Sequence, residues 1–203
     1  MNEVRLRQQL CQLTHQLWAR GLIVADAGLL SVELHRRRYL ATPAGARRAS
    51  LEPEGLVCVD LGGENIQGGP GFAPERWRPH RLAYQLDAEL ETPRTGESEG
   101  EPGLIRATAL TTPPHLLALM RAGRQPLPLA GFAHPLPLVE ASDDDALRRG
   151  LQRHGAVAIH GAGLLTAGAT LDAVVNLAER IEHVATIELA LLRMGDEAAT
   201  TTH

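Results

Sequence analysis

The 203-residue sequence predicts one α/β domain in which helices cover a mixed, largely antiparallel sheet. Short apolar stretches bounded by Gly, Asp and Asn outnumber helical stretches in the first half, and several are close enough to form hairpins. Helical stretches precede, separate and follow these strands, as expected when helices cover a sheet. We expect a single domain over residues 1–203, because no repeat or linker divides the chain.

The spacing of hydrophobic residues and the positions of turn residues predict the bounds of each helix and strand. Leucines spaced four, three and four residues apart predict a first helix over residues 6–17, which Gly21 would end. Strands are predicted within 22–34 (in two parts around a small-residue turn) and at 39–42, 56–61, 103–109, 156–159 and 164–167. Further helices are predicted over 80–90, over 111–123, from an N-cap at Ser142 to residue 154, and from an N-cap at Thr170 to Gly195.

The remaining segments are predicted to be loops. Residues 68–79 are rich in Gly and Pro, and residues 126–139 form an extended passage punctuated by Pro. Residues 91–102 combine Thr, Gly, Ser, Pro and Glu, so we expect an exposed, mobile acidic loop there. A disordered tail is expected at about residues 196–203.

Composition excludes several classes of function. A net charge of −4 gives no general attraction for nucleic acid or for an anionic membrane. There is no apolar run of membrane-spanning length and the amino terminus does not resemble a signal peptide, so a cytoplasmic protein is expected. All 20 basic residues are Arg. Because Schiff-base chemistry, pyridoxal-phosphate anchoring and the Walker phosphate loop each need a Lys, all three are excluded.

Five landmarks in fixed order carry a resemblance to a known family. They are Gly28-Leu29-Leu30-Ser31, Thr42-Pro43-Ala44-Gly45, the strand-turn-strand of 51–68, Trp77–Tyr84 with His80 and Tyr84 four apart, and Gly163–Leu171. Together they resemble the class II aldolase/adducin family, which includes fuculose-phosphate aldolase, over about residues 5–195. The resemblance implies a three-layer α/β/α fold and a homo-oligomer of the tetrameric kind.

The family's metal site does not carry over. Family members hold zinc on three histidines, two from a His-Thr-His and one from an Asn-His-Gly. These histidines fall on Ala107, Ala109 and Ala162, which have no lone pair to give a metal. The resemblance therefore implies no metal and no cofactor in this chain. The family's acid-base glutamate falls on Arg76, or on Glu75 if the loop shifts by one residue.

Most residues of the family's phosphate-binding site are also absent. Of the phosphate-binding loops, only Gly28, Thr42 and Gly45 persist, which leaves a small anionic ligand conceivable. Arg106 and His160 flank the degraded motifs, and a metal site relocated to His115, His134 and His160 stays open as an alternative.

Two functions follow from the resemblance. The first is a family member without metal-dependent aldolase activity, a pseudoenzyme that acts as a binding, structural or regulatory subunit, alone or with an active relative. The alternative is a lyase or isomerase of aldolase or epimerase type on a small sugar-phosphate or carbonyl compound. Its rebuilt site would use Arg76, Glu75, Arg106 or His160.

Overall fold

Eight strands form one sheet in the computed structural model, which describes residues 2–35, 37–69, 72–90, 105–124 and 135–200. The strands are β1 (Leu29–His35), β2 (Arg38–Ala41), β3 (Val57–Val59), β4 (Asn65–Gln67), β5 (Ala107–Thr111), β6 (Leu138–Val139), β7 (Ala156–Ile159) and β8 (Gly163–Gly168). Their order is β4-β3-β2-β1-β5-β8-β7-β6. Neighbouring strands pair antiparallel except β6 and β7, which confirms the mixed, largely antiparallel sheet.

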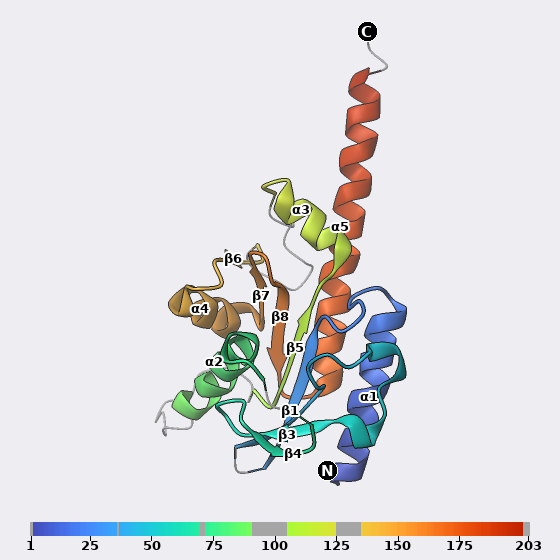
Figure 1. The fold of residues 1–203 in the computed structure, drawn as a ribbon. Helices are drawn as coiled ribbons and strands as arrows, with labels where there is room; N and C mark the ends of the chain where they lie inside the picture. Colours follow the sequence, from blue (N-terminus) through green and yellow to red (C-terminus); the bar gives the residue numbers. More distant parts are fainter. Residues whose placement is uncertain (1, 36, 70–71, 91–104, 125–134, 201–203) are drawn as a thin grey trace.

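Helices cover both faces of this sheet (Figure 1). They are α1 (Glu3–Ala19), α2 (Pro74–Leu90), α3 (Pro114–Arg121), α4 (Asp144–His154) and α5 (Leu171–Thr200), with short 3-10 turns at Arg48–Ser50 and Pro53–Gly55. α2 and α4 pack on one face, while α1, α3 and α5 pack on the other. The predicted three-layer α/β/α fold is therefore confirmed.

Side chains alternate between the two layers along each strand, as a pleated strand requires. On β5, Ala107 and Ala109 join the core beneath α1 and α5. Leu110 packs instead against the core beneath α2 and α4. Even-numbered and odd-numbered residues of β5 thus belong to opposite faces of the sheet, which decides below which of them can share a site.

Several predicted boundaries were wrong. β5 ends at Thr111 instead of residue 109, and α3 begins at Pro114 instead of residue 111. Residues 22–24 belong to a loop instead of a strand, and the Leu22 carbonyl accepts from the Thr112 N–H at 2.7 Å. α2 begins at Pro74, six residues before the predicted start, and contains Pro79. The side chain of Asp143, not Ser142, caps α4. α5 continues through Gly195 to Thr200, so residues 196–200 of the expected tail are helical. The acidic segment 91–102 lies outside the described residues.

The burial of Trp77 explains why α2 begins at Pro74, inside the Gly- and Pro-rich stretch that was predicted to be a loop. Its indole is fully buried, stacks on Phe72 (centroids 5.4 Å apart) and on His80 (5.3 Å), and donates to the Leu61 carbonyl at 2.9 Å. The β3–β4 turn closes over it at Gly63, where a Cβ would lie 2.8 Å from the indole. The first turns of α2 are thus fixed by tertiary packing, which overrides the local loop signal.

A buried carboxylate joins α5 to α3. Glu182 accepts from the backbone N–H groups of His115 and Leu116, each at 3.0 Å, and from His115 Nδ1 at 2.7 Å. These N–H groups belong to the first turn of α3, which has no partner for them within its own helix. Glu182 therefore caps α3 from a distant part of the chain.

Replacing Glu182 with Gln should lower the free energy of unfolding by about 1–3 kcal/mol, because a charge-assisted cap is lost and an amide N–H₂ faces a donor. Urea unfolding followed by circular dichroism measures this. Glu179→Gln is the matched control, since Glu179 accepts from the side chains of Gln16 and the exposed Arg20 but caps no helix, and its loss should cost less than about 1 kcal/mol. Equal losses in the two variants would contradict the capping role.

Candidate functional site

A buried polar network fastens α2 to the centre of the sheet. Ser31 Oγ of β1 lies 2.8 Å from each of His80 Nδ1, Tyr84 Oη and Thr108 Oγ1, and Thr108 Oγ1 lies 2.5 Å from His80 Nδ1. Ser31, Thr108 and His80 are fully buried, and Tyr84 is nearly so. Because no substrate can reach Ser31, the serine–histidine contact joins structural elements instead of activating a nucleophile.

Burial also sets the charge of this network. Burial, and secondarily the nearby Arg76 guanidinium, lowers the pKa of His80 from its ordinary value of 6.5 to about 3, so the imidazole is neutral. Burial likewise raises the pKa of the Tyr84 hydroxyl well above its ordinary range. The network is therefore uncharged near neutral pH, and α2 holds its position without a buried ion.

One turn before His80, α2 presents Arg76 toward the loop that leads into β1. Arg76 Nη2 donates to the Asp26 carbonyl at 2.7 Å. Its neighbour Glu75 is exposed in the first turn of the helix. The position implied for the family's acid-base glutamate thus holds a guanidinium, a cationic group that offers N–H donors to an anion and has no acceptor atom.

A second arginine ties the two loops that resemble the phosphate-binding loops. Arg48 is fully buried and donates to the carbonyls of Pro43 (2.8 Å), Gly28 (2.8 Å) and Asp26 (3.1 Å). Burial, reinforced by repulsion from Arg76, lowers its pKa to about 10, which still leaves it charged near neutral pH. Arg48 therefore brings the Gly28 loop and the 42–45 loop together beside Arg76.

The three retained loop residues occupy different environments in this structure. Gly28 has φ +78°, and a Cβ there would lie 2.4 Å from Ile23, so only glycine fits. Thr42 is buried, and its Oγ1 accepts from the Leu30 N–H at 3.2 Å. Gly45 has φ +73° and faces open space. Of the three, Gly45 is the one positioned beside solvent, while Gly28 and Thr42 shape the backbone.

The three alanine positions implied for metal ligands are not brought together. Ala107 and Ala109 are buried beneath α1 and α5, whereas Ala162 packs against the core on the α2 and α4 side. Because residues 107 and 109 point to the far face of the sheet, histidines there would not meet one at 162. Alanine also offers no donor, so these residues do not fit a zinc ion.

The carboxyl end of β5 is the part of the strand that approaches Ala162. Thr111 pairs with Leu164, and a Cβ on Gly163 would lie 2.1 Å from the Thr111 carbonyl oxygen. Leu110 and Ala162 both pack at the margin of the same core. The two regions therefore meet around Leu110–Thr112, next to Gly28, whose Cβ would lie 3.0 Å from the Leu110 carbonyl oxygen.

The other sequence-based candidates lie apart from one another. Arg106 is half exposed at the opposite end of β5 and pairs with Glu33 at 3.4 Å. His160 is half exposed in the β7–β8 turn, 3.8 Å from Glu140, and His115 is held by Glu182. His134 lies outside the described residues. Among the described residues, no three His, Cys, Asp or Glu side chains gather as a metal site would require.

Sequence reasoning missed Arg48 and the partners of His80. Arg48 stands beside Arg47 in a stretch that carries no helical or strand period, so nothing marks it as buried. Ser31 and Thr108 are 77 residues apart, and only the sheet pairing brings them together. The four-residue spacing of His80 and Tyr84 was the one usable signal.

Comparisons with known proteins agree with this architecture. Residues 8–92 match the model of the class II aldolase and adducin N-terminal domain. The chain is 28% identical to the 5-methylthioribulose-1-phosphate/5-deoxyribulose-1-phosphate aldolase of Rhodospirillum rubrum over 91% of its length and 80% of that protein. It is 26% identical to the L-fuculose phosphate aldolase of Haemophilus influenzae over 97% of its length and 88% of that protein.

A solved structure extends the similarity to the whole fold. The L-fuculose-1-phosphate aldolase from Thermus thermophilus superposes with a TM-score of 0.70 at 27% identity, covering 93% of this chain and 97% of that one. The fold and the site loops thus define an aldolase-type α/β protein. Over residues 8–92 in sequence, and over most of its length in fold, the chain is similar to class II aldolases. None of the helices in the described ranges is long and apolar enough to span a bilayer.

The neutral His80 predicts a pH dependence of stability. In the unfolded chain His80 regains its ordinary pKa of 6.5, so below that pH the unfolded state binds a proton that the folded state does not. Stability should be full above about pH 6.5 and fall as the pH drops toward 3, by at most about 1.4 kcal/mol per pH unit from this group.

Urea unfolding at pH 7, 6, 5 and 4 measures the slope in wild type, His80→Gln and His183→Gln. In His80→Gln, the slope of the unfolding free energy against pH should fall by the contribution of about one proton, whatever the absolute stability of the variant. His183→Gln, on an exposed face of α5, should keep the wild-type slope. An unchanged slope in His80→Gln would rule out this role for the buried imidazole.

Proposed function

We propose that this protein is a class II aldolase family member that binds a small organic anion without a histidine-bound metal, and that it acts as a binding or regulatory subunit. The observation that carries the proposal is Arg76, which stands in the place implied for the acid-base glutamate and is held there by the Asp26 carbonyl. Arg48 adds a second positive charge behind the same loops. A paired guanidinium environment favours phosphate or carboxylate.

The proposal also places the family's first two metal ligands on Leu110 and Thr112 instead of Ala107 and Ala109. Leu110, unlike the two alanines, shares a face of the sheet with Ala162. Leu110 and Ala162 carry no metal donor, and the Thr112 hydroxyl donates to the Leu22 carbonyl at 3.4 Å. The aldolase reaction of such a site would lack both its Lewis acid and its proton-transfer group.

The alternative function is a lyase on a small sugar phosphate, and the named activities of the relatives favour it. Carbon–carbon cleavage needs a group that stabilises the developing enediolate and a group that exchanges a proton. Arg76 meets the first need. Glu75 or His160 would have to meet the second, and both side chains are exposed.

Calorimetric titration with L-fuculose 1-phosphate, paired with an aldehyde-release assay, separates the two functions. We expect one phosphate ester to bind per chain, Arg76→Gln to weaken binding at least about tenfold, and no aldehyde to appear. Arg47→Gln, at an exposed arginine next to Arg48, should bind as wild type does. Turnover that Arg76→Gln or His160→Gln abolishes would establish the lyase and overturn the binding function.

We also expect the protein to self-assemble, and α5 is the element that favours it. This helix extends beyond the rest of the fold (Figure 1). Ile187, Leu191 and Met194 are 45%, 56% and 66% exposed and recur four and three residues apart, so they form one apolar stripe. Such a stripe is typical of a helix that packs on a partner.

Light scattering coupled to gel filtration tests this assembly. Ile187→Glu with Leu191→Glu should lower the native mass toward that of one 21.9 kDa chain, because charges would be buried in the interface. Val4→Glu with Val24→Glu replaces equally exposed apolar residues elsewhere and should leave the mass unchanged. A monomeric wild type would contradict the prediction at once.

A further inference from the structure

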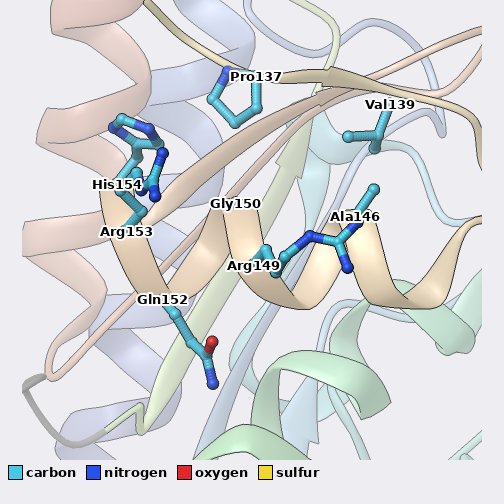
Figure 2. Close-up of a pocket in the computed structure, with 8 residues that line it drawn as sticks. All are labelled: Pro137, Val139, Ala146, Arg149, Gly150, Gln152, Arg153 and His154. Atoms are coloured by element: carbon cyan, nitrogen blue, oxygen red, sulfur yellow. The ribbon is translucent and has the colours of Figure 1, made fainter. Parts of the chain in front are cut away.

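A pocket of about 630 Å³ lies at the edge of the sheet, between α4 and the segment that contains β6 (Figure 2). It is lined by Pro137, Val139, Ala146, Arg149, Gly150, Gln152, Arg153 and His154. None of these residues belongs to the candidate site described above, which lies on β1, β2, β5, β8 and the start of α2. Its volume is within the range of small-molecule sites.

The floor of the pocket is apolar and closely packed. A Cβ on Gly150 would lie 2.5 Å from Val157 Cγ2 and 3.0 Å from Pro137 Cγ, so α4 approaches the sheet as closely as a glycine permits. Pro137 and Val139 face the helix from the strand side, and Ala146 continues the apolar surface along α4 (Figure 2). This close contact makes the floor a fixed surface for an apolar group.

The helix side of the pocket is cationic. Arg149 and Arg153 are one turn apart on α4, and Figure 2 shows Arg149 reaching along the helix toward Ala146 while Arg153 gathers beside His154. Both arginines are exposed, and neither forms a hydrogen bond or ion pair within the described part of the chain. The residues that line the pocket include no carboxylate.

Two of the three acidic residues at the start of α4 are engaged away from the pocket. Asp143 accepts from the Ala146 N–H at 2.9 Å, and Asp144 pairs with Arg78 of α2. They therefore do not neutralise Arg149 and Arg153, and the third, Asp145, one turn before Arg149, is not among the residues that line the pocket. Arg149 and Arg153 thus place two guanidinium groups beside an apolar floor, in a chain whose net charge is −4. Such groups bind anions through charge-assisted hydrogen bonds.

We propose that this pocket binds a small organic anion, a compound with an apolar body and one phosphate or carboxylate group. The apolar body lies on Pro137, Val139, Ala146 and Gly150, and the anionic group pairs with a guanidinium of the helix side, that of Arg149 or Arg153. The pocket is separate from the Arg76 site and does not depend on the function proposed for that site.

Calorimetric titration with phenyl phosphate tests the proposal, because the probe combines an apolar ring with a dianion. The titration uses the full-length chain carrying Arg76→Gln, so that the candidate site does not contribute. We expect saturable binding of one probe per chain. Adding Arg149→Gln and Arg153→Gln should weaken it at least about tenfold, and Gln152→Glu, an exposed change that adds a carboxylate to the rim, should weaken it in the same direction.

Adding Arg121→Gln and Arg124→Gln instead is the matched control, since it removes the same charge from exposed positions at the end of α3 and should leave binding unchanged. The absence of saturable binding, or an equal loss in the control, would overturn the proposal. Binding of an acidic peptide with no binding of phenyl phosphate would overturn it too, because the surface would then be a protein-docking site.

Discussion

The position of α2 on the sheet is the constraint on which the rest of the site depends. Four side chains from three elements (Ser31, Thr108, His80 and Tyr84) hydrogen-bond to one another in the core, and Trp77 fills the volume beside them. An unpaired polar group at this depth would cost about 1–3 kcal/mol, so the network fixes the register of the helix as well as its distance from the sheet. Arg76 lies one turn before His80 on α2, so the register of the helix also sets the position of Arg76. The loops it faces are held by Arg48, whose three carbonyl acceptors span the Gly28 and Pro43 segments.

A frame of this kind can be kept while the chemistry it supports changes. The family's fold requires the hairpins, the covering helices and the glycines of the loops, and these are all present. In the function proposed above, the positions that would supply the donors for the reaction are Leu110 and Ala162, with Arg76 at the start of α2. Glu182 stabilises the fold next to the end of β5, because it caps α3 immediately after that strand. Glu182 thus fixes the start of α3 next to this strand end.

Much of the fold could be predicted from the sequence because its signals are local. The leucines of α1, the Gly-rich turn between β7 and β8, and the N-cap Thr170 each act within a few residues. The failures came where tertiary packing overrides local signals. α2 begins early because Trp77 is buried, and residues 22–24 form a loop in which Ile23 packs against Gly28 and the Leu22 carbonyl accepts from the Thr112 N–H. The candidate site was harder still. Ala107 and Ala109 lie on the opposite face of the sheet from Ala162, whereas the proposed positions 110 and 112 lie at the strand end beside Gly163, and only the strand pairing reveals this.

Metal content in designed histidine variants tests the central claim, that the aldolase frame is intact and lacks donors at Leu110, Thr112 and Ala162. Elemental analysis after purification with zinc should find little zinc in the wild type and about one zinc per chain in Leu110→His, Thr112→His, Ala162→His. The variant Ala107→His, Ala109→His, Ala162→His should gain none, because two of its imidazoles would point beneath α1 and α5. Stoichiometric zinc in the wild type, or zinc gained by the second variant instead of the first, would contradict the account.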